Sequence, residues 1–106
     1  MIFLMSQPAQ ISPSMPSPAL AEQLRALGER FGVRNIRVFG SVARREATDA
    51  SDLDLLVDYV PGQSGFAFLR FCREVEALVG RRVDVATVDS LHPLIKEQVL
   101  HEAVPL

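Results

Sequence analysis

The chain has 106 residues, enough for one domain with a modest hydrophobic core. Its 48% hydrophobic and 23% charged residues are ordinary for a soluble globular protein, and a net charge of −2 argues against gripping nucleic acid mainly through phosphate contacts. The single cysteine, Cys72, excludes a disulfide framework, and no apolar run is long enough to span a membrane, so we expect a buried, unreactive thiol in a cytoplasmic protein.

The first segment of the chain, residues 1–17, is rich in Pro, Ser, Gln and Met and shows no periodicity, so we expect a disordered arm. One folded domain over residues 18–106 follows. Ser17 and Pro18 are typical of a helix start, an N-cap followed by proline in the first turn. Gly32 is well placed to end this helix. The apolar residues at helical spacing between them are Leu20, Leu24, Leu27 and Phe31.

Strands and helices alternate through the rest of the domain. Strands are predicted over residues 35–39, 53–57 and 82–86, with a brief helix through residues 42–46 after a Gly40-Ser41 turn. Two longer helices are predicted from apolar spacing, one carrying Phe68, Cys72, Val75 and Val79 and a final one carrying Leu91, Ile95, Val99 and Ala103. This order predicts a small α/β (α+β) fold, a mixed sheet of three or four strands with helices packed on it.

Two aspartates, Asp52 and Asp54, lie at the start of the strongest predicted strand. Their side chains project from the same face, with Cα atoms about 6.5–7 Å apart, while Leu53 and Leu55 point toward the core. Two unpaired carboxylates at this distance repel each other, and a divalent cation such as Mg²⁺ removes that cost. Asp84 stands between two apolar residues of another strand, so the three acids would converge if the two strands were neighbours.

Three converging carboxylates can hold two metal ions about 3.5–4 Å apart, the spacing for in-line phosphoryl transfer. One metal would activate an acceptor hydroxyl and the other would neutralise the leaving pyrophosphate, while Asp84 could also accept the hydroxyl proton. The Asp-x-Asp pattern also occurs by chance at strand starts and in solvated loops, so by itself it leaves a structural role open.

A phosphate-binding turn is predicted at Gly40 and Ser41, between a strand and a short helix, where N–H groups and the helix dipole can receive an anion. Glycine lets the main chain approach closely, the Ser41 hydroxyl adds a donor, and Arg44 can reach the same oxygens. A Gly-Ser turn alone is weak evidence. Followed by the arginine and the Asp-x-Asp strand, it forms a much narrower pattern.

Other polar residues receive a structural interpretation. Asp58 lies at the far end of its strand, where we expect it to be solvated or paired with an arginine. His92 and His101 are too far apart for a helical metal pair, and we expect both at the surface.

These motifs resemble the nucleotidyltransferase superfamily of the DNA polymerase β type. The resemblance rests on the Gly-Ser turn in residues 40–46, the Asp-x-Asp strand in residues 51–58, and Asp84 as a third acid on a further strand. The small size and the final residues, 91–106, resemble the minimal nucleotidyltransferase (MNT) subgroup, the MntA-like antitoxins of toxin–antitoxin pairs. One departure is Arg45, where the family often has glycine.

The resemblance implies the small nucleotidyltransferase fold and the Mg²⁺-dependent transfer of AMP from ATP to a tyrosine hydroxyl of a cognate HEPN-type RNase toxin. It implies that Gly40 and Ser41 contact the triphosphate and that Asp52, Asp54 and Asp84 bind Mg²⁺ and are catalytic. A chain this short offers little acceptor surface, so we expect a hetero-complex. Exposed residues of the last helix, or residues 66–71, would form the docking face, although packing of residues 66–71 against the first helix is the slightly preferred interpretation.

Two alternatives remain open at this point. The chain could be a non-catalytic antitoxin that neutralises its partner by forming a complex, although all three acids and the Gly-Ser turn are intact. It could also transfer a nucleotide to a small molecule, but relatives of that kind carry an additional acceptor-binding domain. A polymerase that extends tRNA or DNA is disfavoured for the same reason and by the slightly acidic charge.

Overall fold

The computed structural model describes residues 14–60, 62 and 64–106. Most of the predicted arm, residues 1–17, lies outside the described residues, so its disorder stays a prediction. The elements are α2 (Pro18–Phe31), β2 (Val33–Phe39), α3 (Gly40–Ala43), β3 (Leu53–Tyr59), α4 (Gly65–Val79), β4 (Val83–Thr87), the 3₁₀ turn η1 (Val88–Ser90), α5 (Pro93–Glu102) and β5 (Val104–Pro105). Across the described part of the chain, no helix is long and apolar enough to cross a membrane.

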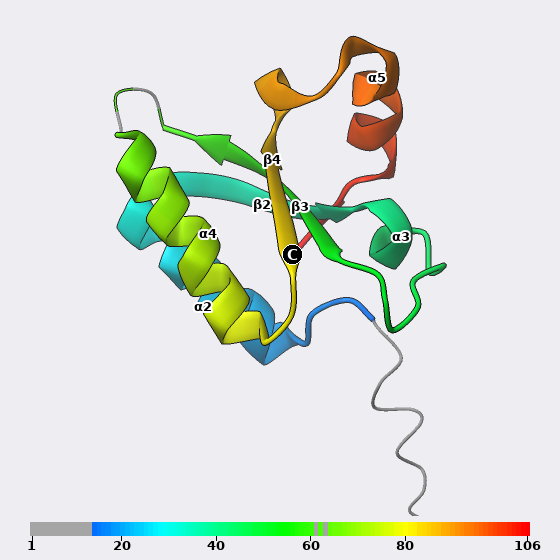
Figure 1. The fold of residues 1–106 in the computed structure, drawn as a ribbon, viewed down its shortest axis with the longest axis horizontal. Helices are drawn as coiled ribbons and strands as arrows, with labels where there is room; N and C mark the ends of the chain where they lie inside the picture. The colour runs from blue at the N-terminus through cyan, green and yellow to red at the C-terminus, as the bar shows by residue number, and fades with distance from the viewer. Residues whose placement is uncertain (1–13, 61, 63) are drawn as a thin grey trace, which may run out of the picture.

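Within the described residues, four strands form one mixed sheet in the order β4-β3-β2-β5, which confirms the predicted fold class (Figure 1). β2 and β3 are antiparallel neighbours, and β3 and β4 are parallel, joined by the crossover helix α4. β5 adds a short antiparallel edge next to Arg37 and Val38 of β2. β5 is not among the predicted strands. Ala103, predicted in the last helix, lies just beyond it, since that helix ends at Glu102 because Pro105 favours extended backbone just before it.

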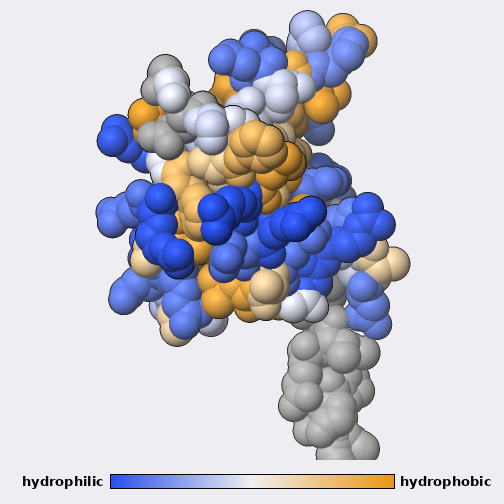
Figure 2. All heavy atoms as spheres, turned by 60° about the vertical axis from the view of Figure 1, so that its left-hand side comes forward, coloured by the Kyte–Doolittle hydropathy of each residue, from blue (hydrophilic) through white to orange (hydrophobic). Residues whose placement is uncertain are grey.

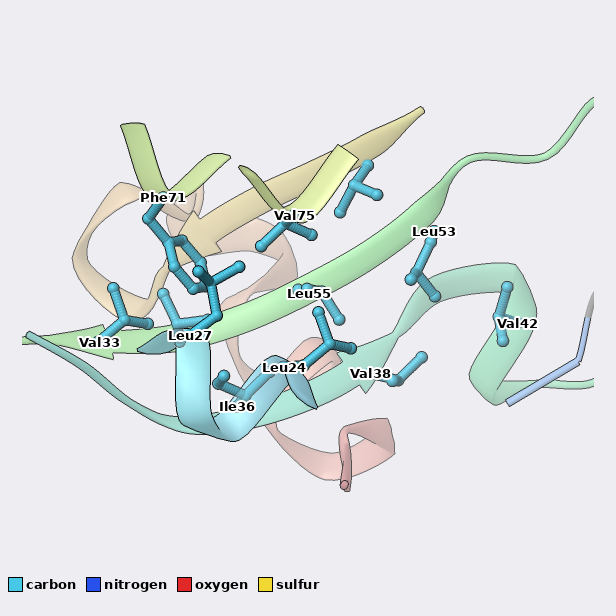
Figure 3. Packing of buried hydrophobic residues seen from close by; sticks show 12 residues of the cluster. Leu24, Leu27, Val33, Ile36, Val38, Val42, Leu53, Leu55, Phe71 and Val75 are labelled. Carbon is cyan, nitrogen blue, oxygen red and sulfur yellow. The ribbon is translucent and has the colours of Figure 1, made fainter. Parts of the chain in front are cut away.

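Helices α2 and α4 lie side by side on one face of the sheet, as Figure 1 shows. The predicted start and end of α2 are confirmed: the Ser17 hydroxyl accepts a hydrogen bond from the Leu20 amide, and Gly32 closes the helix in the left-handed conformation. Figure 3 shows how side chains of these two helices meet those of β2 and β3 in the main core. Its fully buried members include Leu24, Val38, Leu55, Val57, Phe71 and Val75.

The aromatic residues of α4 differ from one another in burial. Phe71, which was not in the predicted apolar stripe, is fully buried, whereas Phe68 and Cys72 are only half-buried. Phe68 packs edge-on against Tyr59, with ring centroids 5.0 Å apart, and Phe66 is 79% exposed. The aromatic residues of α4 therefore do not share one buried face of the helix.

The opposite face of the sheet carries a smaller apolar cluster under α5. Leu56 of β3 packs there with Leu91 and Val99. Ile95, predicted on the core side of α5, is 46% exposed because this helix covers only part of the sheet. Since residues of a strand alternate between faces, Asp54 lies on the same side as Leu56 and therefore on the side of α5.

Candidate functional site

Asp54 and Asp84 stand side by side at the start of the parallel pair β3 and β4. The register places Leu53 opposite Val83 and Asp54 opposite Asp84. Neighbouring strands are about 4.8 Å apart, and paired residues of parallel strands point to the same face, so the two carboxylates share one patch of the sheet. The apolar neighbours Leu53 and Val83 pack in the core, which fixes the face to which the two acids point.

Electrostatic repulsion and burial act together on Asp54. The pKa of Asp54 is raised from 3.8 to about 6, first because the half-buried carboxyl loses water and then because Asp84 and Asp52 repel its charge. Glu102 adds to the repulsion, whereas Arg44 opposes it. A carboxylate strained in this way is one that a bound cation would stabilise.

Asp52 lies just before β3, two residues from Asp54. Its Oδ1 atom is 3.9 Å from Nε of Arg82, and the exposure of both side chains makes this a weak ion pair. The loop that carries Asp52 is held from β4's side, since the Arg81 guanidinium donates to the carbonyl of Ser51 and the Leu53 amide donates to the Arg82 carbonyl.

Gly40 meets Asp54 where β2 turns into α3. Phe39 is paired with Asp54 across the antiparallel ladder, and Gly40 follows it with φ of +75°, a conformation that favours glycine. A β-carbon on Gly40 would lie 2.2 Å from Oδ2 of Asp54. The turn and the acid are therefore in direct contact, although they are separated in sequence.

Arg44 follows the single turn of α3, and two carboxylates hold its guanidinium. Nε donates to Glu46 at 3.0 Å, and Nη1 donates to Glu102 at 3.1 Å. These two hydrogen bonds, that of Glu46 first, raise the pKa of Arg44 above its usual value. Glu102 also accepts a hydrogen bond from the Gly40 amide at 2.8 Å.

Glu102 was missed by the sequence analysis. It lies 62 residues from Gly40 along the chain, and a lone glutamate at a helix end is ordinarily solvated. The amphipathic pattern of α5 was the only available signal, and it predicts which side faces the sheet but not which polar residue reaches a turn on β2.

The predicted ligand residues fit a magnesium ion in their chemistry but do not form a complete cage. Asp52, Asp54 and Asp84 offer carboxylate oxygens, which Mg²⁺ prefers, and one or two carboxylates commonly suffice for it. Among the residues that the structure describes, no group of three or more His, Cys, Asp or Glu side chains is arranged to hold a metal ion. The metal-binding role of the three acids stays a prediction.

The other polar residues behave as the sequence indicated. Asp58 pairs with Arg37, whose Nη2 lies 2.9 Å from its Oδ1. His92 caps α5 by accepting a hydrogen bond from the Leu94 amide, and His92 and His101 are both exposed. Cys72 is half-buried rather than buried, and the loss of water around it raises the pKa of its thiol, which disfavours the reactive thiolate.

Comparison with known proteins gives a consistent result. Residues 20–106 match the model of the family described as the nucleotidyltransferase domain. A Thermococcus cleftensis protein named protein adenylyltransferase MntA is 45% identical over 85 residues, which cover 80% of this chain and 86% of that protein. A Methanocaldococcus jannaschii protein assigned as a protein adenylyltransferase is 43% identical over 75 residues, covering 71% of this chain and 81% of that protein.

Solved structures share the fold. One assigned as a minimal nucleotidyltransferase has a TM-score of 0.75 and 45% identity, and the match covers 83% of this chain and 90% of that one. A toxin–antitoxin crystal structure with AMP-PNP has a TM-score of 0.66 at 17% identity, covering 80% of this chain and 70% of that one. At that identity the second match shows the fold alone.

Proposed function

Because this chain belongs to the nucleotidyltransferase domain family, we propose that it is a protein adenylyltransferase that moves AMP from ATP onto a hydroxyl group of a partner protein. The single observation that carries the proposal is the register that sets Asp54 beside Asp84, with Gly40 packed against Asp54. This strand pair brings two acids together on one face, next to a turn and an arginine. Such an arrangement suits a nucleoside triphosphate and its bound cation.

In the proposed reaction the acceptor oxygen attacks the α-phosphorus of ATP. The bond between that phosphorus and the bridging oxygen of the pyrophosphate breaks, pyrophosphate leaves, and the hydroxyl proton passes to a carboxylate, for which Asp84 is our candidate. Ser41 and Arg44 would bind the β- and γ-phosphates and align the leaving group. Gly40 would contribute by leaving room for Asp54 and for the phosphates.

Asp52, Asp54 and Asp84 would hold Mg²⁺ in this proposal, as one ion or two. When bound, the metal supplies positive charge that activates the acceptor oxygen and neutralises the leaving pyrophosphate. The raised pKa of Asp54 supports this role, since repulsion among neighbouring acids is what a divalent cation relieves.

The acceptor we propose is a tyrosine hydroxyl on a cognate HEPN-type toxin, with this chain as its antitoxin in the cytoplasm. The relative named MntA and the toxin–antitoxin structures with the same fold support this choice. Exposed apolar side chains support a protein partner in general: Phe66 and Leu69 on α4, and Leu94, Ile95 and Leu100 on α5. Figure 2, turned so that the side of α2 and α4 comes forward, shows apolar surface in the upper part of this face above a band of hydrophilic residues.

The test is a transfer assay with ATP labelled at the α-phosphate, Mg²⁺ and the purified product of the neighbouring gene. We expect label on the partner, none when the label is on the γ-phosphate, and none with the Asp52→Asn/Asp54→Asn variant. Asp89→Asn, which changes an exposed acid at the other end of β4, is the matched control and should transfer normally.

A partner that binds tightly but stays unlabelled would contradict the proposal and favour the non-catalytic antitoxin. Mass spectrometry of the labelled partner identifies the acceptor residue. An added AMP on serine, threonine or a small molecule rather than tyrosine would keep the transferase but refute the proposed acceptor.

A further inference from the structure

The turn that carries Gly40, Ser41 and Arg44 is too short to hold its own shape. α3 comprises only the four residues Gly40–Ala43, and its N-cap, Phe39, makes no capping hydrogen bond through its side chain. A single helical turn is unfavourable in isolation because it fixes several backbone angles for one or two hydrogen bonds. Contacts from elsewhere in the fold must therefore hold it.

Glu102 provides such a contact at both ends of α3. Its Oε2 accepts from the Gly40 amide at 2.8 Å, at the start of the turn, and from Nη1 of Arg44 at 3.1 Å, just after its end. The Glu102 side chain is only 15% exposed. It is the last residue of α5, and β5 pairs with β2 immediately after it, so its backbone is anchored on the same strand that leads into the turn.

The two carboxylates leave one side of the Arg44 guanidinium available. Nε faces Glu46 and Nη1 faces Glu102. A guanidinium has five N–H donors, and those on Nη2 make no hydrogen bond to any residue that the structure describes. The planar group is thus held from two directions with a pair of donors unused.

We propose that Glu102 is a positioning residue of the nucleotide site: it fixes the Gly40 turn and orients Arg44 so that the free edge of its guanidinium meets the phosphates of ATP. This inference rests on the proposed function. In this proposal α5 carries none of the predicted ligands, yet it sets the geometry of the phosphate-binding side of the site. The part of its effect on ATP that acts through the charge on Arg44 must depend on Arg44 being present.

The experiment is a double-mutant cycle on Mg·ATP binding, measured by calorimetry, with Glu102→Gln, Arg44→Ala and the pair. Glu102→Gln keeps the shape and one acceptor for the Gly40 amide but loses the charge that holds Arg44. We expect it to weaken ATP binding about tenfold, as loss of a charge-assisted hydrogen bond implies. In the Arg44→Ala background the same change should cost less than about twofold. Glu97→Gln, an exposed glutamate on the same helix, should bind ATP like the wild type.

Three results would overturn the assignment. Equal losses from Glu102→Gln with and without Arg44 would mean a general structural effect. Unchanged binding would mean no role. Tighter binding would mean that the Glu102 carboxylate competes with phosphate for the turn rather than supporting it.

A second measurement needs no nucleotide and separates this inference from the proposed function. In proton–nitrogen spectra, Glu102→Gln should shift the guanidinium signal of Arg44 Nη1, which donates to Glu102, and Glu102→Ala should expose the Gly40 amide to faster exchange, while Glu97→Gln should do neither. If wild-type protein fails to bind ATP but shows these effects, the proposed function fails and the link between Glu102 and the turn stands. If the Gly40 amide and the Arg44 signal are unaffected, the positioning role fails whatever the protein binds.

Discussion

The carboxylate of Asp54 lies where a side chain at position 40 would begin: a β-carbon on Gly40 would be 2.2 Å from Oδ2 of Asp54. The glycine of the turn and the second aspartate of the Asp-x-Asp strand look like separate motifs in the sequence. In the fold they are one packing unit, because Phe39 pairs with Asp54 and the chain turns directly over the carboxylate. Position 40 therefore favours glycine for two reasons: the turn has a positive φ, and the Asp54 carboxylate leaves no room for a β-carbon.

Gly40→Ala should therefore damage the site beyond its effect on stability. The left-handed backbone at position 40 alone costs about 1–2 kcal/mol for a residue with a β-carbon. The displaced Asp54 carboxylate should further reduce transfer on the order of 100-fold, the typical effect of a misplacement of about 1 Å. Gly80→Ala is the matched control, since Gly80 has φ of +79° with nothing within 4 Å of the added carbon, so it should lose stability but keep activity. Urea unfolding and the transfer assay measure the two effects, and normal transfer by Gly40→Ala would contradict this account.

Asp54→Asn should stabilise the metal-free protein at neutral pH. The folded-state pKa of about 6 lies above the ordinary 3.8, so the folded protein holds the proton more tightly than the unfolded chain. Stability from this group is present below pH 4 and is lost as pH rises toward and through 6. We expect the variant to melt above the wild type at pH 7.5 in EDTA, with the gain vanishing at pH 4. Asp89→Asn serves as the control, and an equal gain at both pH values would contradict the prediction.

Magnesium should raise the melting temperature in a pH-dependent way. Cation binding needs the deprotonated carboxylates. Below pH 6, Asp54 is protonated in most of the molecules, because its pKa is about 6. The shift produced by Mg²⁺ should be larger at pH 8 than at pH 5, should disappear on addition of EDTA, and should be absent from Asp52→Asn/Asp54→Asn. Thermal melts in matched ionic strength provide the measurement, and a shift of the same size in the double variant would place the cation elsewhere.

Arg45→Gly should stabilise the protein. Arg45 is exposed and has φ of +61°, a backbone conformation that costs a residue with a side chain about 1–2 kcal/mol and glycine almost nothing. Allowing for the greater freedom of glycine in the unfolded chain, we expect a net gain of about 0.5–1 kcal/mol in urea unfolding. Arg73→Gly, in the middle of α4, is the opposite control and should lose about 1 kcal/mol. Destabilisation by Arg45→Gly would show that the arginine makes a contact worth more than the strain.

Local features of the fold could be predicted because their causes are local. Ser17, Pro18 and Gly32 determine where α2 begins and ends through a few neighbouring hydrogen bonds and backbone angles. The family's frequent glycine after this arginine also has a local cause, since Arg45, which stands at that position here, adopts a left-handed conformation. The apolar residues around Asp54 and Asp84 were enough to assign both acids to strands.

Features that depend on packing between distant segments could not be predicted. The sequence gives no register for β3 against β4, which α4 sets by packing across the sheet. β5 is only two residues long and shows no strand pattern. The bond from Gly40 to Glu102 joins residues that no short-range pattern relates.

The pairing of Asp54 with Asp84 makes the two acids sensitive to insertions and deletions in a way that point substitutions do not reveal. Removing one residue inside β3 or β4 would reverse the facing of every side chain beyond it, sending a valine to the surface and an aspartate into the core. Catalytic loss and misfolding would then arise from the same event, so we expect insertions and deletions to be tolerated only in the loop before Asp52 and in other connections outside these strands. The placement of the two acids therefore depends on the length and register of the strand pair as a whole.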